Sequence, residues 1–258
     1  MRLFNFPLLL ISLFVFASRS SPSSKPIITR HDIADSQFVL LADSYTEINS
    51  LIFFNKTDMA GTLIKNGWVL SAAHVAADLG IGDSLLTKTK KYRIDQIYIH
   101  PEWKNNQAYD LALIKINTEN DSLPTVPLYQ SRDELHKIVV IAGNGAKGSG
   151  LSGPVGNDGQ VRAATNRVEE VTDYWLKWKF YNPDTDSNSV TDMEGISGPG
   201  DSSGPAFIFI DGKGYLAGIS SGQSTQATGG EEGVYGVREY YVRISSYVDW
   251  ITAMLSKN

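Results

Sequence analysis

The chain has 258 residues, of which 23 are Lys or Arg and 28 are Asp or Glu, so its formal net charge is −5. The basic residues are interspersed among the acids, which argues against a nucleic-acid footprint or a polybasic membrane patch. The chain has no cysteine, which excludes disulfides, thiol chemistry and Cys-type zinc sites. We therefore expect no metal ion, no cofactor and no nucleic-acid partner, and a monomer held together by packing alone.

The first residues predict an export signal. Met1-Arg2 gives a positive start, Phe6–Ala17 is almost unbroken apolar sequence, and small and polar residues follow from Ser18 to Ser24. This apolar run is too short to span a bilayer comfortably, which favours a cleaved signal peptide over residues 1–20. We expect a secreted protein, extracellular or periplasmic, with no membrane association after cleavage. Residues 21–30 are expected to form a propeptide or an N-terminal extension.

Short β-type runs separated by turn residues fill the rest of the chain, which carries 23 glycines and 10 prolines. This spacing predicts an antiparallel sandwich or barrel, and the lack of alternating helical patterns argues against a parallel α/β fold. The predicted strands are Phe38–Leu41, Ser50–Phe54, Gly61–Ile64, Trp68–Ser71, Tyr92–Ile99, Leu111–Ile116, Ile138–Ala142, Gln160–Asn166, Trp175–Phe180, Ala206–Ile210, Gly214–Ser220 and Tyr240–Ile244.

Two helical segments and two long loops complete the predicted elements. Apolar residues of Ser246–Lys257 recur at helical spacing, which predicts a C-terminal amphipathic helix. Ala72–Leu79 is expected to contain one further helical turn. The glycine-rich segments Gly143–Gly159 and Gln223–Gly236 are typical of long surface loops.

The segment Gly200-Asp201-Ser202-Ser203-Gly204-Pro205 is the strongest chemical signal in the chain. A serine becomes a nucleophile when a base takes its proton and an acid orients that base. The segment also fits the nucleophile elbow of α/β-hydrolases, but that elbow needs a following helix and a later histidine. Here Pro205 and a predicted strand follow. Every histidine precedes Ser202, namely His31, His74, His100 and His136.

His74 and Asp110 are the upstream candidates for the other two roles. His74 follows the predicted strand Trp68–Ser71, and Asp110 directly precedes the predicted strand Leu111–Ile116. Alone, His74 fits an ordinary core or surface histidine, and Asp110 fits a turn residue or cap. Together with Ser202 they give the order His, Asp, Ser, one of the chain orders in which a catalytic triad is built. The amides of Gly200 and Ser202 are candidates for an oxyanion hole.

Four segments resemble the trypsin/chymotrypsin family of serine endopeptidases, and in particular its secreted bacterial members. The segments are GWVLSAAHV at Gly67–Val75, HPEW with YDLALIKI at His100–Trp103 and Tyr109–Ile116, SGPGDSSGPA at Ser197–Ala206, and YYVRISSYVDWI at Tyr240–Ile251. The resemblance implies two six-stranded antiparallel β-barrels, an active site between them and a C-terminal helix. It places a protease domain at residues 31–258, with barrels at about 31–140 and 141–245 and the helix at 246–257.

The same resemblance implies a reaction. His74 becomes the general base, Asp110 its orienting acid and Ser202 the nucleophile that hydrolyses peptide bonds through an acyl-enzyme. Protein or peptide substrates follow. The alternative is a catalytically silent or zymogen-locked binding protein on the same fold, because a fold does not prove an activity.

The chain departs from the family pattern in places. Val75 stands where the family commonly has a half-cystine, and Ser203 replaces the glycine that usually follows the nucleophile. In the family a freed N-terminal amine pairs with the aspartate before the nucleophile and supports the oxyanion hole. That aspartate is Asp201, and its partner is expected to be either a trimmed terminus near Ile27 or another cation such as Arg30.

The resemblance leaves the specificity of the substrate pocket open. Ile196 stands at the pocket floor, where trypsins have aspartate. Glu239 aligns with another wall, where it attracts a basic side chain unless a loop displaces it, in which case an apolar pocket remains. Ser220, Ser221 and Gly222 are expected to form the wall against which a substrate backbone pairs as an added strand.

Overall fold

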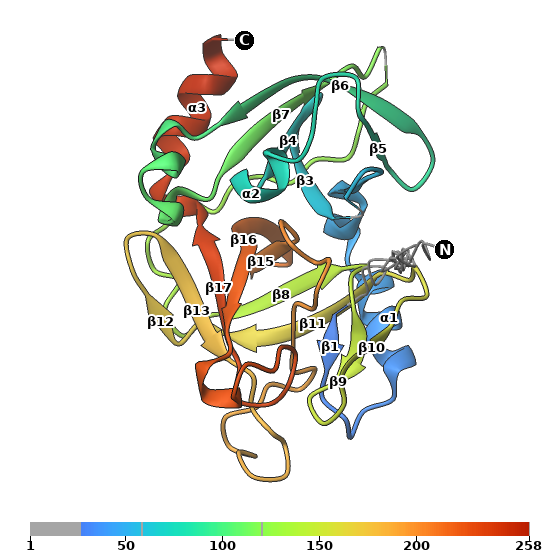
Figure 1. The fold of residues 1–258 in the computed structure, drawn as a ribbon, viewed down its shortest axis with the longest axis vertical. Helices are drawn as coiled ribbons and strands as arrows, with labels where there is room; N and C mark the ends of the chain where they lie inside the picture. Colours follow the sequence, from blue (N-terminus) through green and yellow to red (C-terminus); the bar gives the residue numbers. More distant parts are fainter. Residues whose placement is uncertain (1–26, 58, 120, 258) are drawn as a thin grey trace, which may run out of the picture.

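The computed structural model describes residues 27–57, 59–119 and 121–257, and Figure 1 shows their arrangement. The predicted signal peptide, residues 1–20, lies outside these ranges. The described chain is mostly β, with two large β-layers stacked along the long axis of the molecule (Figure 1).

The first layer is a closed six-stranded antiparallel barrel, in the order β2-β3-β4-β7-β6-β5. Closure removes the exposed strand edges that an open sheet carries. The strands are β2 (Leu51–Phe54), β3 (Ala60–Lys65), β4 (Trp68–Ser71), β5 (Ser84–Leu86), β6 (Lys91–Ile99) and β7 (Ala112–Ile116).

The second layer is a curled antiparallel sheet in the order β11-β8-β15-β16-β17-β13-β12. Its strands are β8 (Ile138–Gly143), β11 (Arg162–Arg167), β12 (Glu170–Val171), β13 (Trp175–Lys179), β15 (Pro205–Ile210), β16 (Lys213–Ser224) and β17 (Arg238–Arg243). The predicted fold class is confirmed in this form: a closed barrel, a curled half-barrel and a C-terminal helix. The barrel strands lie within 51–116, well inside the expected 31–140.

A small third sheet, in the order β10-β9-β1-β14, ties the N-terminal segment into the fold. Its strands are β1 (Ile28–Thr29), β9 (Lys147–Ser149), β10 (Gly153–Gly156) and β14 (Gly195–Ile196). Two of them, β9 and β10, lie within the expected surface loop. Ile27 and Ile28 are buried, so the last residues of the expected 21–30 extension belong to the packed structure.

The helices are α1 (Asp35–Ser44), α2 (Ala73–Ala76) and α3 (Val248–Lys257). The prediction of a strand at Phe38–Leu41 is wrong, because this run lies inside α1. Phe38 and Ala42, four residues apart, form the buried face, while Leu40 is 59% exposed. The short helical turn after His74 and the C-terminal helix are present.

The 3-10 turns are η1 (Thr46–Ser50), η2 (Pro101–Lys104), η3 (Gln107–Tyr109), η4 (Gln226–Thr228) and η5 (Ile244–Ser246).

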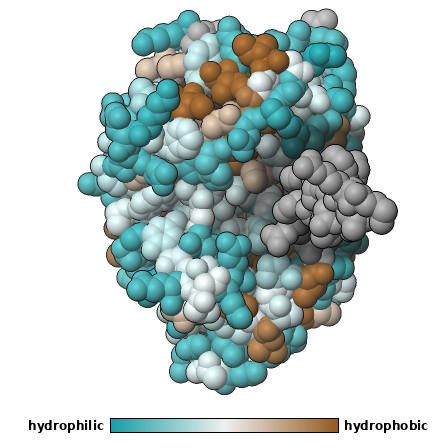
Figure 2. Space-filling view, in the orientation of Figure 1, coloured by the Kyte–Doolittle hydropathy of each residue, from teal (hydrophilic) through white to brown (hydrophobic). Residues whose placement is uncertain are grey.

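Helix α3 packs against the barrel beside the segment that leads to Asp110. The Tyr247 hydroxyl, one residue before α3, donates to the Ala108 carbonyl at 3.0 Å, and the rings of Trp250 and His100 have centroids 4.9 Å apart. Within the described residues no helix is long and apolar enough to cross a membrane. The face in Figure 2 is mostly hydrophilic, with hydrophobic residues gathered in a few small groups.

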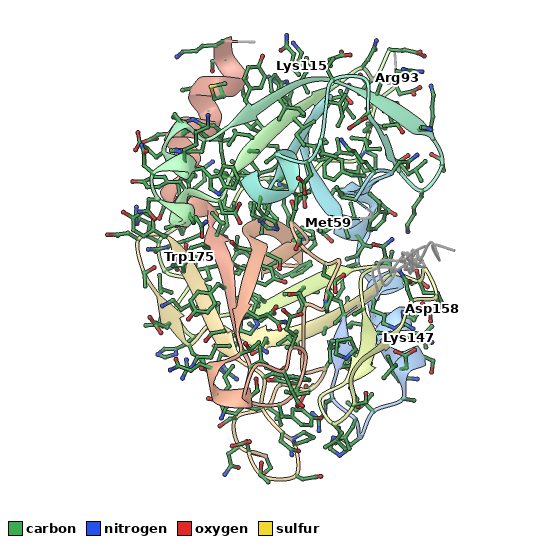
Figure 3. All side chains as sticks on the ribbon, viewed as in Figure 1. Met59, Arg93, Lys115, Lys147, Asp158 and Trp175 are labelled. Carbon is green, nitrogen blue, oxygen red and sulfur yellow. The ribbon has the colours of Figure 1, made fainter. Side chains whose placement is uncertain are left out.

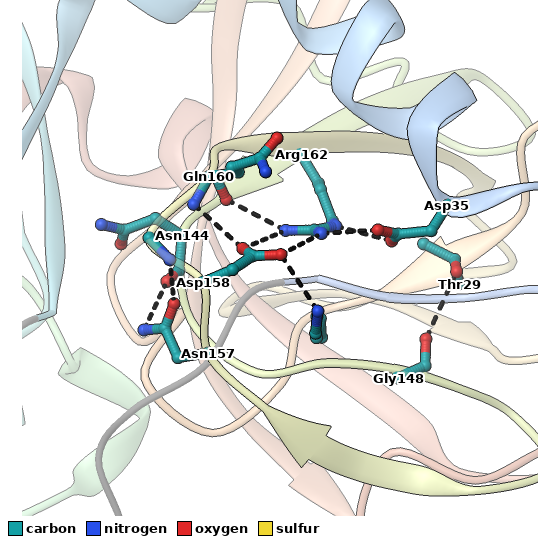
Figure 4. A network of polar contacts seen from close by, with 10 residues as sticks. Thr29, Asp35, Asn144, Gly148, Asn157, Asp158, Gln160 and Arg162 are labelled. Carbon is teal, nitrogen blue, oxygen red and sulfur yellow. Dashed lines mark hydrogen bonds and ion pairs between the residues drawn. The ribbon is translucent and has the colours of Figure 1, made fainter.

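An ionic network around Arg162 joins α1 to the 143–159 segment (Figure 4). The Arg162 side chain is almost fully buried and binds both carboxylate oxygens of Asp35 at 2.7 and 2.6 Å. It also binds both oxygens of Asp158, at 3.0 and 2.8 Å. The guanidinium holds the pKa of Asp158 well below its usual range. Lys147 completes the network on Asp158, as Figure 3 also shows. Bidentate pairs of this kind fix geometry as well as charge.

Candidate active site

The barrel brings His74 and Asp110 together through the pairing of β4 with β7. Ser71, the last residue of β4, pairs with Ala112, the first residue of β7. His74 lies three residues beyond Ser71 and Asp110 lies two residues before Ala112, so both reach the same end of the barrel. The His74 ring Nδ1 lies 2.7 Å from Asp110 Oδ2, and the His74 amide donates to Oδ1 at 2.8 Å.

Asp110 is buried, and its carboxylate has three hydrogen-bonding partners. Its side chain is only 5% exposed, and the Ser221 hydroxyl donates to Oδ2 at 2.5 Å. Ser221 lies in β16 of the second layer, so this contact crosses between the two layers. A carboxylate held by three donors fixes the orientation and tautomer of the imidazole that it binds. His74 is left with Nε2 as its other ring nitrogen, and its side chain is 34% exposed.

Ser202 and Ser203 differ in their surroundings although they are adjacent. Ser202 is half-buried, whereas Ser203 is fully buried. The Ser203 hydroxyl accepts from the Ala72 amide at 2.8 Å and donates to the Ser71 hydroxyl at 3.0 Å. It therefore points into the segment that precedes His74. The Ser202 hydroxyl makes no hydrogen bond with another described residue, His74 included, and the Ser202 carbonyl accepts from the Ala60 amide at 3.3 Å.

The backbone around Ser202 leaves two amide donors unpaired. The Pro199 carbonyl accepts from the Ala146 amide at 3.0 Å, which points it toward the 143–159 segment. In a trans peptide the next N–H points the opposite way, so the Gly200 amide faces away from Ala146. Gly200 has φ 95°, a conformation that favours glycine. Within the described chain neither the Gly200 amide nor the Ser202 amide donates a hydrogen bond. Two free donors therefore flank the serine.

Asp201 lies under this loop and is 1% exposed. Its carboxylate accepts from the amides of Gly145 at 2.6 Å and Gly198 at 2.8 Å. Burial raises the pKa of Asp201 to about 7. A Cβ on Gly143 would come within 2.1 Å of this carboxylate, so position 143 needs glycine. Arg30, one of the expected partners, pairs with Asp32 at 2.6 Å instead.

A recess of about 510 Å³ opens beside His74 and Asp110. Ser221 and Gly222 line it, together with Gln223 and the aromatic side chains Trp103, Trp175 and Tyr240. Figure 3 places Trp175 at the level where the two layers meet. Ser220 does not line this recess. It is buried, and its hydroxyl lies 3.2 Å from that of Ser197.

The remaining predicted pocket residues are both buried. Ile196 packs in a core cluster with Ile27 and Ile28. The Glu239 carboxylate accepts from the Ser197 amide at 3.0 Å, from the Ser197 hydroxyl, and from the Trp178 indole N–H at 3.2 Å. Neither Ser197 nor Gln223 was anticipated at this site. Beyond a register shift in β16 between Ser220 and Gly222, Gln223 pairs with Glu239, and a glycine within a strand, such as Gly222, is a sequence signal for such a shift.

Within the described residues no group of three or more His, Asp or Glu side chains is arranged to hold a metal ion. A hydroxyl, an oriented imidazole and two free amides constitute the parts needed for nucleophilic acyl transfer.

Comparison with known proteins gives the family. A sequence model of the trypsin family matches residues 47–251. The chain is 22% identical over 247 residues to an uncharacterized peptidase of Corynebacterium glutamicum (strain R), covering 92% of this chain and 79% of that protein. It is 26% identical over 220 residues to chymotrypsin-like elastase family member 1 of Macaca fascicularis, covering 77% and 79%. It is also 26% identical over 246 residues to the complement C1s-1 subcomponent of Mus musculus, covering 80% of this chain and 33% of that longer protein.

The family match spans well over half of the chain, so the chain belongs to the trypsin family. The resemblance read from the four sequence segments is confirmed. Family membership supports serine peptidase activity and implies protein or peptide substrates.

Proposed function

We propose that this protein is a secreted serine endopeptidase in which His74, Asp110 and Ser202 form the catalytic triad. The observation that carries the proposal is the contact of 2.7 Å between His74 Nδ1 and Asp110 Oδ2, at the edge of the recess that Ser221 and Gly222 also line. A second support is that Ser203 is engaged in structural hydrogen bonds, which leaves Ser202 as the reactive hydroxyl.

In the proposed reaction His74 Nε2 takes the Ser202 proton while the serine oxygen attacks the scissile carbonyl carbon. The oxyanion that forms is stabilised by the amides of Gly200 and Ser202, and losing one such donor costs about 3 kcal/mol. The imidazolium then protonates the leaving amine, and the C–N bond breaks to give an ester on Ser202. Water attacks that ester in the reverse sequence, which releases the acid product and restores the serine.

Asp201 supports this loop in the proposal. Its hydrogen bonds from the amides of Gly198 and Gly145 join the backbone just before Gly200 to the 143–159 segment. Burial favours the neutral form of its carboxyl group, so the same contacts position the loop without requiring a charged partner.

Export belongs to the same proposal. The apolar segment Phe6–Ala17 acts as a signal peptide that is cleaved after Ser20, and the mature protein works as a monomer outside the cytoplasm. A mature domain of about 235 residues can bury a full core without disulfides.

A fluorophosphonate probe tests the catalytic assignment, because it reacts with an activated serine irrespective of substrate preference. We expect labelling that maps to Ser202 and disappears in Ser202→Ala and in His74→Ala, whereas Ser203→Ala retains it. Absence of labelling in folded, processed protein, or labelling that maps to Ser203, would refute the assignment. The first of these results favours the silent binding protein.

A further inference from the structure

The sequence contains two Asn-Gly pairs, Asn66-Gly67 and Asn144-Gly145. An asparagine side chain reacts with the backbone nitrogen of the next residue, and a glycine in that place permits the closest approach because it has no Cβ. The reaction releases ammonia and converts the asparagine to aspartate or isoaspartate. The structure holds the two reacting carboxamides differently, so the two pairs can be compared within one chain.

The carboxamide of Asn66 is held at both ends. Asn66 lies in the turn between β3 and β4, its Nδ2 donates to the Asp121 carbonyl at 3.1 Å, and its Oδ1 accepts from the Leu123 amide at 3.2 Å. Both hydrogen bonds have to break before the side chain turns onto the Gly67 nitrogen. Each is worth about fivefold in an equilibrium, so together they disfavour the reactive conformation by at least about tenfold.

The side-chain carbonyl of Asn144 has no such anchor. Its Oδ1 is buried and has no hydrogen-bond partner within the described chain. An unsatisfied buried acceptor costs free energy, so this carbonyl loses no hydrogen bond when it turns. The backbone of Asn144, in contrast, is held in place, because the Asn157 side chain donates to the Asn144 main-chain carbonyl at 3.3 Å (Figure 4). The carboxamide is therefore the part of this residue that is free to move.

The Gly145 nitrogen, which the carboxamide would meet, already faces a proton acceptor. Its N–H donates to Asp201 Oδ1 at 2.6 Å, in a buried contact. Burial raises the pKa of Asp201 to about 7, so at pH 8 its carboxylate is ionised and is a stronger base than an ordinary aspartate. The Gly145 nitrogen becomes a nucleophile when this proton leaves it.

We propose that Asn144-Gly145 is a self-modification site, at which Asn144 deamidates with Asp201 as the base. The Gly145 nitrogen forms a bond to Asn144 Cγ while its proton passes to Asp201. The Cγ–Nδ2 bond then breaks, and ammonia leaves with that proton. Water opens the resulting cyclic imide at either of its two carbonyls, which leaves aspartate or isoaspartate at position 144.

The modification acts on the loop that supports the nucleophile. In the imide the Gly145 nitrogen carries no hydrogen, so its contact with Asp201, the residue before Ser202, is lost. Isoaspartate adds one methylene to the backbone between Gly143 and Gly145, and a Cβ on Gly143 would already come within 2.1 Å of Asp201. We expect the protein to lose activity as isoaspartate accumulates. This consequence rests on the proposed endopeptidase function, whereas the deamidation itself does not.

Mass spectrometry of the ageing protein tests the reaction. We would incubate the Ser202→Ala protein at pH 8, which excludes self-cleavage, and follow the peptides of Asn66 and Asn144 with fragmentation that separates aspartate from isoaspartate. Asn144 is expected to deamidate at least about tenfold faster than Asn66, which serves as the internal control. Adding Asp201→Asn should slow the reaction at Asn144 at least about tenfold and leave that at Asn66 unchanged.

Two results overturn the proposal. One is an unmodified Asn144, or an Asn66 that is modified as fast or faster. The other is a ratio of the two rates that stays the same in urea, where both pairs lose their structure, because the flanking sequence would then explain the difference. An equal or higher rate at Asn144 in Asp201→Asn contradicts the role of Asp201, and thermal unfolding shows whether that variant keeps its fold.

Fluorophosphonate labelling follows the consequence in protein with Ser202 intact. The labelled fraction should fall in step with isoaspartate at position 144 in the wild type and in Asn66→Ala. It should stay constant in Asn144→Ala, which cannot form the imide, while the intact mass shows that no chain has been cleaved. An equal fall in Asn144→Ala overturns the link to activity. Deamidation at Asn144 as expected, with no labelling of fresh protein, would refute only the endopeptidase function.

Discussion

Ser203 offers a direct test of how the loop of the nucleophile is held. Ser203 has φ 69°, in the left-handed region that glycine adopts freely and other residues adopt at a cost of about 1 kcal/mol. In return its hydroxyl satisfies the buried Ala72 amide at 2.8 Å and contacts the Ser71 hydroxyl at 3.0 Å. The Ala72 amide has no other acceptor within the described chain. Leaving such a donor unsatisfied costs about 1–3 kcal/mol.

Two substitutions separate these effects. Ser203→Ala keeps the backbone strain and loses the hydrogen bonds, so it should reduce the free energy of unfolding by about 2 kcal/mol. Ser203→Gly loses the same hydrogen bonds but relieves the strain, so it should cost only about 1 kcal/mol. For a domain of this size, about 1 kcal/mol corresponds to roughly 2–4 °C in Tm. We therefore expect Tm to fall in the order wild type, Ser203→Gly, Ser203→Ala.

Differential scanning calorimetry measures this order, and fluorophosphonate labelling follows the nucleophile in the same samples. Both variants should keep Ser202 reactive, because the Ser203 hydroxyl is engaged with Ala72 and Ser71 and Ser203 does not line the recess. A Ser203→Ala protein as stable as the wild type would refute the hydrogen-bond argument. A Ser203→Gly protein less stable than Ser203→Ala would refute the strain argument.

Three further outcomes are expected. Asp110→Asn should lower the labelling rate and kcat by about 10⁴-fold while Tm changes little, because the amide holds the wrong imidazole tautomer; an active Asp110→Asn would contradict the triad. Ser221→Ala removes one of the three donors to Asp110 and should lower kcat by about tenfold without moving KM; a change confined to KM would argue against a positioning role. Burial raises the pKa of Asp201 and of Glu239 to about 7, from ordinary values of 3.8 and 4.5. Between about pH 4 and 7 the folded chain therefore binds protons that the unfolded chain has released, and the free energy of unfolding falls as the pH rises. Glu239→Gln should flatten the decline of Tm between pH 5 and 8, and an unchanged slope would show that Glu239 does not titrate in that range.

The parts of the site that local sequence determines were predictable. His74 follows β4 and Asp110 precedes β7, and the pairing of these two strands is enough to bring them together. The prediction of Ser202 as the nucleophile rests on its glycine-rich surroundings and on the position of every histidine upstream of it, and it stays a prediction. These features depend on where strands end and on the short loops beside them, and both are determined by residues that are close together in the sequence.

The parts that depend on pairing between distant segments were not predictable. The bulge in β16 between Ser220 and Gly222 turns Ser220 inward and brings Gln223 to the recess, a shift that composition does not reveal. Strands β1 and β14 are two residues long, and they are defined by pairing with each other and, for β1, with β9. The apolar run at Phe38–Leu41 is too short to distinguish a strand from a helix, and contacts with the second layer decide for the helix.

The position of β1 sets a limit on maturation. Ile28 pairs on one side with Gly148 and on the other with Ile196, six residues before Ser202. A processing enzyme that trims the chain up to Ile27 leaves these partners in place. One that cuts further removes the strand that connects β9 to β14, although His74, Asp110 and Ser202 all remain. The chain thus has a shortest working length, and its boundary at Ile27 is set by the small third sheet rather than by any sequence that a processing enzyme must recognise.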